Sequence, residues 1–159
     1  MIHNGIHRNK KALNQLVADL VQAHTVIHQI HWYMRGEGFL FYHPKLDSFM
    51  DDILEQLDVV SERIITIDGS PFSTLKEFSD HTRIPDHKGE WNTSIQEDMH
   101  RVADVIRILA DDYQLGVDAA SKEGDVASED ICTGYLRDAQ KTLWMVEAEL
   151  GQAPNIDKD

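Results

Sequence analysis

Apolar residues recur in steps of three and four along four long segments, and this period predicts four amphipathic helices. The first helix is predicted over residues 10–35 and the second over residues 44–68. The third is predicted to begin near Asn92 or Thr93 and to run to about residue 122, and the fourth covers about 126–150. Four such helices, with a long connection between the second and third, predict an all-α four-helix bundle.

Glycine and proline mark the breaks between these helices. Gly36 and Gly38 interrupt the chain after the first helix, and Pro44 is expected to start the second. Gly69 is expected to end the second helix. Inside the long connection, Thr74 is followed three residues later by Glu77, which predicts a short capped helix.

A single domain is predicted over residues 1–159, with residues 1–8 as a short tail and Asn9 as a possible cap of the first helix. No apolar run approaches the length of a membrane span, and the beginning of the chain, MIHNGIHRNK, has no apolar signal core. The only cysteine, Cys132, is expected to be a packed side chain. These features favour a cytoplasmic protein with no membrane partner.

The formal net charge of −13 argues against a general affinity for nucleic acid, which depends on Lys and Arg neutralising phosphates. An acidic surface attracts metal cations instead. Most of the 28 acidic residues are nevertheless expected only to cover solvated helix faces.

Five residues around the first break have the side chains that bind a hard or borderline metal ion. They are His31, His43, Asp47, Asp58 and Glu62. His43 and Asp47 are four residues apart, as are Asp58 and Glu62, so each pair shares one helix face. The pairs are separated by eleven positions (58 − 47), about 16 Å along a helix, so one ion cannot bind both. Either these are two half-sites, or an antiparallel second copy brings them together; we favour a site shared by two subunits.

A second motif does not predict a metal site. Glu97 and His100 form a Glu-x-x-His element, as in di-iron carboxylate bundles. Such a site needs two of these elements and two further glutamates facing inward, and only one element is found. Glu97 lies two residues, or about 200°, from the core residue Ile95, which predicts that it faces solvent.

The run HWYMRGEGFLFYHPKLD, followed by DVVSE, resembles the signature of the ferritin-like DNA-binding proteins from starved cells (Dps), and most closely the Dps-like peroxide resistance proteins. GSPFSTLKEF and LWMVEAELGQAP extend the resemblance over nearly the whole chain. It implies a ferritin-like four-helix bundle with a short extra helix in the crossover between helices 2 and 3. It also implies a homo-oligomer, a dodecamer of 23 symmetry that forms a hollow shell.

The resemblance implies an intersubunit ferroxidase centre, to which one subunit contributes His31, His43 and Asp47 and its neighbour contributes Asp58 and Glu62. The implied substrates are iron, as Fe(II), and hydrogen peroxide, and the ferric product is stored as mineral, which protects against peroxide stress. Asp125 and Asp130 match carboxylates that line an iron-entry pore, although carboxylates at a helix start also complement the helix dipole. Trp32 would quench radicals.

The alternative function is that of a DNA-compacting nucleoid protein, as in the founding Dps members. That function needs a Lys-rich tail. The beginning of this chain offers only Arg8, Lys10 and Lys11, so direct DNA binding is not expected.

Overall fold

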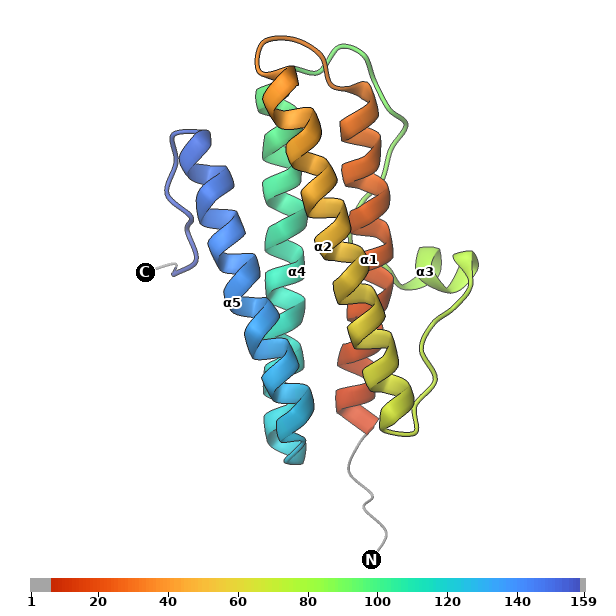
Figure 1. Ribbon diagram of the computed structural model, residues 1–159. Coiled ribbons are helices and arrows are strands. Elements are labelled where there is room, and N and C mark those ends of the chain that lie inside the picture. The colour runs from red at the N-terminus through yellow and green to blue at the C-terminus, as the bar shows by residue number, and fades with distance from the viewer. Residues whose placement is uncertain (1–6, 158–159) are drawn as a thin grey trace, which may run out of the picture.

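Four long helices lie side by side in the computed structural model, which describes residues 7–157 (Figure 1). Helices α1 (His7–Tyr33) and α2 (Phe39–Thr66) form one antiparallel hairpin, and α4 (Ile95–Glu123) and α5 (Val126–Glu149) form another. The short helix α3 (Leu75–His81) stands beside α1 in the connection that returns along the bundle. The described residues contain no strand, which confirms the predicted all-α four-helix bundle with an extra helix in its crossover.

The apolar stripes of the four long helices meet in one core. Tyr113 is its largest fully buried side chain, and the Tyr113 hydroxyl donates to Gln56 Oε1 at 2.7 Å. Other fully buried side chains are Leu13, Leu16, Leu20, Ile27, Ile30, Leu46, Val60, Ile64 and Leu143. None of the helices in residues 7–157 has both the length and the apolar character needed to span a bilayer.

The start of α2 differs from the prediction. The helix begins at Phe39, five residues before Pro44, because Gly38 adopts a left-handed conformation (φ 92°) and its carbonyl accepts from the Phe41 and Tyr42 backbone N–H groups. Pro44 therefore lies inside the helix, in its second turn. It has no N–H to donate to the Leu40 carbonyl, so the helix lacks one backbone hydrogen bond there. Reading Pro44 as the helix start was wrong.

The end of α2 falls at Thr66, and Asp68 rather than Gly69 takes the left-handed conformation (φ 60°). The Gly69 backbone N–H donates to the Ile64 carbonyl at 2.8 Å. A Cβ at Gly69 would lie 2.6 Å from Ile64 Cγ2, so close approach requires a glycine there.

Capping explains the other boundaries. Thr74 and Glu77 form the predicted capping box of α3, and Ser94 and Glu97 form another, so α4 begins at Ile95 instead of near 92. Asn9 is not a cap, because it lies within α1 and is fully buried. Of the predicted tail, residues 1–6 lie outside the described residues, and His7 and Arg8 belong to α1.

An ionic clamp fastens the crossover to the bundle. The Arg83 guanidinium pairs with Asp19 of α1 and Asp112 of α4, two carboxylates whose side chains are fully buried. Asp19 Oδ1 also accepts from the Arg83 backbone N–H at 2.6 Å and from the Thr82 hydroxyl at 2.7 Å. The clamp fixes the end of α3 against the α1–α4 pair.

Candidate metal centre

Two histidines meet where α1 ends and α2 begins. The rings of His31 and His43 are stacked, with centroids 3.6 Å apart and planes inclined by 14°. Each ring bonds the other residue's backbone: His31 Nδ1 lies 2.8 Å from the His43 carbonyl oxygen, and His43 Nδ1 lies 2.9 Å from the His31 carbonyl oxygen. The two helices are thereby joined by a reciprocal pair of contacts.

These contacts determine which ring nitrogens are free for a metal. A carbonyl oxygen only accepts hydrogen bonds, so each Nδ1 must carry the proton. In the neutral imidazole, the other nitrogen, Nε2, then has an available lone pair. A metal-binding histidine is commonly oriented in this way, through a bond from the nitrogen that does not bind the metal. Both His31 and His43 can thus bind a metal ion through Nε2.

Asp47 lies one helical turn after His43. Its Oδ1 is 3.5 Å from His31 Nε2, and its side chain is 58% exposed, whereas the His31 side chain is 10% exposed. The carboxylate therefore faces the ring nitrogen that the hydrogen bonds leave free. Two imidazoles and one carboxylate therefore lie near one another at this end of the bundle, without the arrangement that a single subunit would need to hold a metal ion.

Asp58 and Glu62 form the second group, three turns further along α2. Both side chains are exposed, and neither is hydrogen-bonded or ion-paired to another part of residues 9–157. At about 1.5 Å per residue, this group lies about 16 Å from Asp47. In the described part of the chain, no three His, Cys, Asp or Glu side chains are arranged so that they could hold a metal ion. One subunit thus offers two incomplete groups.

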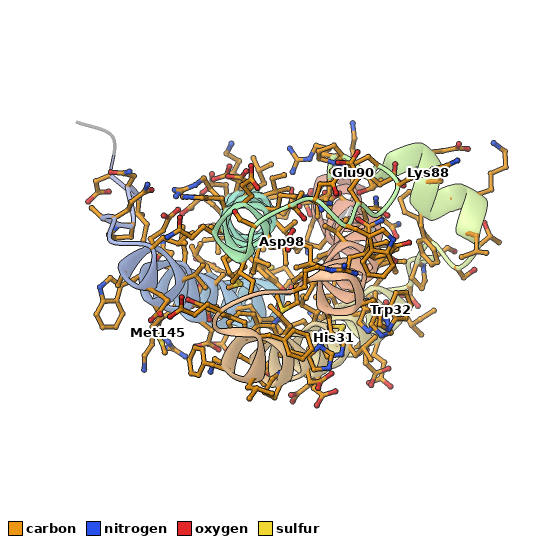
Figure 2. All side chains as sticks on the ribbon, turned by 90° about the horizontal axis from the view of Figure 1, so that it is seen from above. His31, Trp32, Lys88, Glu90, Asp98 and Met145 are labelled. Carbon is orange, nitrogen blue, oxygen red and sulfur yellow. The ribbon has the colours of Figure 1, made fainter. Side chains whose placement is uncertain are left out.

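Aromatic rings adjoin the histidine pair. Trp32 is 62% exposed, and its ring lies 3.8 Å from that of His28, which in turn is 5.9 Å from that of His31. Looking down the bundle, Figure 2 shows His31 and Trp32 on the α1–α2 side and Asp98 at the beginning of α4. Burial, followed by the charge of neighbouring His28, lowers the pKa of His24.

Asp125, one of the two predicted pore carboxylates, is held in the turn between α4 and α5. It caps α5 by accepting from the Ser128 backbone N–H at 3.1 Å, and it accepts from Arg63 Nη2 and Asn9 Nδ2, each at 2.7 Å. Burial tends to raise the pKa of Asp125, but hydrogen bonds from Ser128 and Arg63 outweigh it and lower that pKa. Asp130 is exposed in α5.

Sequence reasoning did not single out Arg63. Its Nε donates to the Ser128 hydroxyl at 2.8 Å, in addition to the contact with Asp125. The only signal in the sequence is an arginine directly after the candidate ligand Glu62. Its partners are more than 60 residues away in the chain.

Two further expectations are confirmed. Glu97 is exposed and occupied in the capping box of α4, so the Glu-x-x-His element does not face the bundle interior. Cys132 is fully buried, and burial raises the pKa of its thiol to about 12. Neither residue is part of the candidate centre.

Known proteins resemble the chain in both sequence and fold. Residues 10–156 match the ferritin-like domain family, Ferritin. A DNA protection during starvation protein from Streptococcus suis is 48% identical over 148 residues, 93% of this chain and 86% of that protein. Dps from Listeria monocytogenes superposes with a TM-score of 0.89 at 38% identity, covering 92% of this chain and 95% of that one. Dps from Listeria innocua, soaked with cobalt, gives a TM-score of 0.90 at 36% identity, covering 97% and 99%.

Proposed function

The chain belongs to the Dps family of ferritin-like proteins, and from this premise we propose that it is a ferroxidase that oxidises Fe(II) and stores the ferric product. Iron is its substrate and cargo, and hydrogen peroxide is its preferred oxidant. The protein forms a hollow dodecamer of 23 symmetry in the cytoplasm, where it limits damage by peroxide.

The reciprocal hydrogen bonds of His31 and His43 are the observation that carries the proposal. They leave both Nε2 atoms unprotonated, and His31 Nε2 lies 3.5 Å from Asp47 Oδ1, in a group with too few ligands to be a complete site. The centre is completed by Asp58 and Glu62 of the partner subunit. Symmetry about a two-fold axis repeats the arrangement, which gives two centres per dimer.

The proposed ligands suit iron chemistry. Imidazole and carboxylate groups bind Fe(II), and the anionic carboxylates stabilise the higher charge of Fe(III). Two Fe(II) ions give up one electron each to one peroxide molecule. The O–O bond breaks, two protons are taken up, and two water molecules form. The paired electron transfer avoids releasing hydroxyl radical, and the exposed indole of Trp32 quenches radicals that escape.

Iron enters, in this proposal, through a pore lined by Asp125 and Asp130 at the α4–α5 turn. Asp130 is the better placed of the two, because its side chain is exposed whereas the Asp125 side chain is 12% exposed and already bonded. The ferric product then accumulates in the acidic cavity of the shell.

Complementation between two inactive variants tests the shared centre. His43→Ala removes a ligand from one half-site and Asp58→Ala removes one from the other. Each homogeneous particle should oxidise Fe(II) with peroxide at least about tenfold more slowly, because a ligand is missing from every centre. Particles reassembled from a mixture contain some centres with all five ligands and should recover part of the activity.

Full activity in either homogeneous variant, or no recovery in mixed particles of confirmed mass, would contradict the shared centre.

The competing function, DNA compaction, is disfavoured by the net charge of −13. Failed complementation together with retardation of plasmid DNA at ~0.15 M salt would favour that function instead.

A further inference from the structure

Arg63 lies one residue after the candidate ligand Glu62 and points to a different side of α2, because successive helical residues are turned by about 100°. Its side chain is only 18% exposed. It reaches across to the beginning of α5, where Nη2 donates to Asp125 Oδ1 at 2.7 Å and Nε donates to the Ser128 hydroxyl at 2.8 Å. One guanidinium thus holds the Asp58–Glu62 end of α2 against the other hairpin.

The acceptor, Asp125, is itself fixed. Besides Arg63, its carboxylate accepts from the Ser128 backbone N–H, the Ser128 hydroxyl and Asn9 Nδ2. The Asn9 backbone N–H, near the start of α1, donates to the Glu123 carboxylate at 3.2 Å. Arg63 is therefore bonded to a network that includes the beginnings of α1 and α5 and the end of α4.

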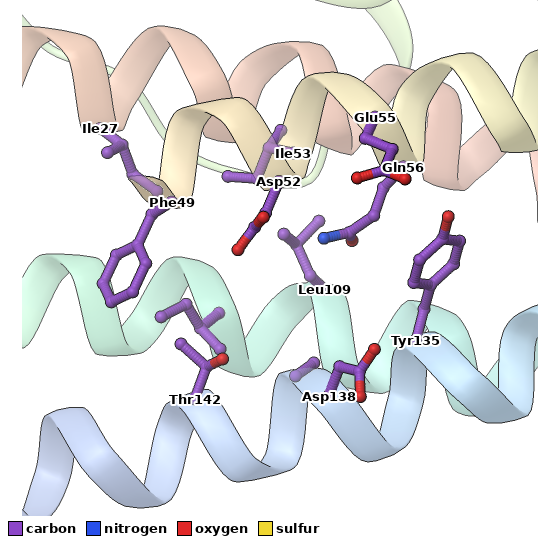
Figure 3. Close-up of a pocket in the computed structure, with 12 residues that line it drawn as sticks. Ile27, Phe49, Asp52, Ile53, Glu55, Gln56, Leu109, Tyr135, Asp138 and Thr142 are labelled. Carbon is purple, nitrogen blue, oxygen red and sulfur yellow. The ribbon is translucent and has the colours of Figure 1, made fainter. Parts of the chain in front are cut away.

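Elsewhere, α2 and α5 are separated by open grooves. One, of about 320 Å³, has Asp52, Glu55 and Gln56 of α2 on one side and Tyr135 and Asp138 of α5 on the other (Figure 3). Another, of about 240 Å³, continues toward the beginning of α2.

In residues 7–157, two further side-chain hydrogen bonds link α2 to the second hairpin, one far from the half-site and one two residues before Asp58. Tyr42 donates to Glu149 near the beginning of α2, and Gln56 accepts from Tyr113 near its middle. Asp58 and Glu62 lie between the groove residue Gln56 and Arg63. The Arg63 anchor is therefore the hydrogen-bonded link closest to Glu62.

We propose that Arg63 is a positioning residue for the iron centre. Through its ion pair with Asp125, it fixes the Asp58–Glu62 half-site that α2 presents to the partner subunit, without binding metal itself. This inference rests on the proposed function and deepens it, because it gives the α4–α5 turn a role in the affinity of the centre. The same ion pair neutralises a cation that would otherwise lie beside Glu62 and repel an incoming metal ion.

Cobalt(II) titration of the metal-free assembled particle tests the proposal. The visible absorption of bound cobalt reports both the affinity and the ligand geometry of the centre. Arg63→Met should weaken cobalt binding roughly tenfold and change the absorption spectrum. A loss of affinity of about tenfold is at the lower end of what is seen when groups that orient metal ligands are removed. Arg63→Lys should recover only part of the affinity, because an ammonium lacks the planar fork that reaches both acceptors.

The matched control is Arg107→Met. Arg107 donates to Glu147 Oε1 and to the Asn155 carbonyl oxygen, both at 3.1 Å, so it is a comparable partly buried pair at a different place. It should lower thermal stability without changing cobalt affinity. Asp125→Asn removes the same ion pair with little change of shape, and should weaken binding in the same direction even if Arg63→Met does not assemble. The double variant Arg63→Met/Asp125→Asn should bind cobalt no more weakly than Arg63→Met alone, because the same ion pair is lost in both proteins.

Glu62→Gln separates the two hypotheses. Unchanged cobalt affinity in Glu62→Gln would contradict the proposed centre. If Glu62→Gln loses affinity while Arg63→Met and Asp125→Asn retain both affinity and spectrum, the positioning role of Arg63 is wrong and the centre stands. Equal losses in Arg63→Met and Arg107→Met would also overturn it, since general loosening of the subunit would then be the cause.

Discussion

Each imidazole of the candidate centre has one nitrogen bonded to a backbone carbonyl and one left for metal. The His31 carbonyl lies in the last turn of α1, where backbone acceptors have no partner within the helix. His43 Nδ1 supplies one. His43 therefore both caps α1 and offers a candidate ligand, which links the position of the proposed centre to the stability of the α1–α2 turn.

Cys132 gives a prediction at the level of a single residue. Its thiol is fully buried and its pKa is raised to about 12, chiefly by burial and further by the charge of Asp125. Because a thiolate is the reactive form, native protein at pH 8 should react with a thiol reagent at least about a hundredfold more slowly than unfolded protein. Time-resolved labelling with and without denaturant measures this, and equally rapid labelling of the native particle would contradict it.

The same pKa shift has a consequence for stability. An unfolded thiol ionises near pH 9, whereas the folded thiol remains protonated up to about pH 12. The stabilisation from keeping this thiol neutral is thus fully present below pH 9 and is lost as the pH rises toward 12.

Residue types and short spacings were sufficient to propose the five candidate ligands, because helix periodicity places the members of each pair on one face; that they bind metal remains a prediction. The partners of Asp125 were not predictable in this way. Asn9 and Asp125 are 116 positions apart, and Arg63 and Asp125 are 62 apart. No local pattern indicates that these three residues meet, so Asn9 was wrongly predicted as a cap, and Asp125 was considered only as a pore or helix-start carboxylate.

The crossover depends on one arginine. Asp19 and Asp112 have fully buried side chains, and Arg83 is the cation paired with both of them. Arg83→Met should destabilise the protein by about 2–3 kcal/mol. This is below the 3–5 kcal/mol typical of breaking a buried pair, because the Arg83 side chain is 45% exposed and water can partly replace it.

Thermal unfolding of assembled particles, compared with Arg137→Met, measures this effect. Arg137 and Asp138 form an exposed pair at 3.7 Å, so its loss should change stability by less than about 0.5 kcal/mol. Similar melting temperatures for Arg83→Met and wild type would mean that the clamp does not hold the crossover.

At the level of elements, a complete capping box predicted a helix boundary better than a single capping residue or a proline did. Thr74 with Glu77 indicated the beginning of α3 correctly, because a capping box fixes both partners within one turn. Pro44 gave a wrong boundary because proline is favoured at the first helical position, whereas here it lies in the second turn and leaves one backbone hydrogen bond unmade. The earlier start depends on the left-handed conformation of Gly38, which the sequence permits but does not require.

Large apolar side chains remain exposed on the single chain. Leu40 is 88% exposed at the beginning of α2, Leu75 is 83% exposed in α3, and Val126 is 72% exposed at the beginning of α5. Exposed apolar side chains on several sides of the bundle fit a subunit that contacts several neighbours, as the proposed shell requires.

Iron entry gives a prediction that belongs to the whole assembly. In the proposed shell, three copies of the α4–α5 turn would surround a three-fold axis, so Asp130 would contribute a ring of three carboxylates. Such a ring concentrates a divalent cation, and salt screens the effect. Asp130→Asn should therefore slow Fe(II) uptake about threefold or more at low ionic strength. This is a small part of the roughly 10–10³-fold increase in association rate that electrostatic steering can give.

Comparison with Asp125→Asn distinguishes entry from positioning. A residue that acts only in entry changes the rate of uptake and its salt dependence, and leaves the equilibrium affinity of the centre unchanged. Asp130→Asn should behave in this way, whereas Asp125→Asn should weaken cobalt binding at equilibrium because it releases Arg63. Stopped-flow uptake across a range of salt concentrations, combined with cobalt titration, measures both quantities. If Asp130→Asn takes up iron at the wild-type rate at every salt concentration, Asp130 only complements the dipole of α5, and the entry route lies elsewhere in the shell.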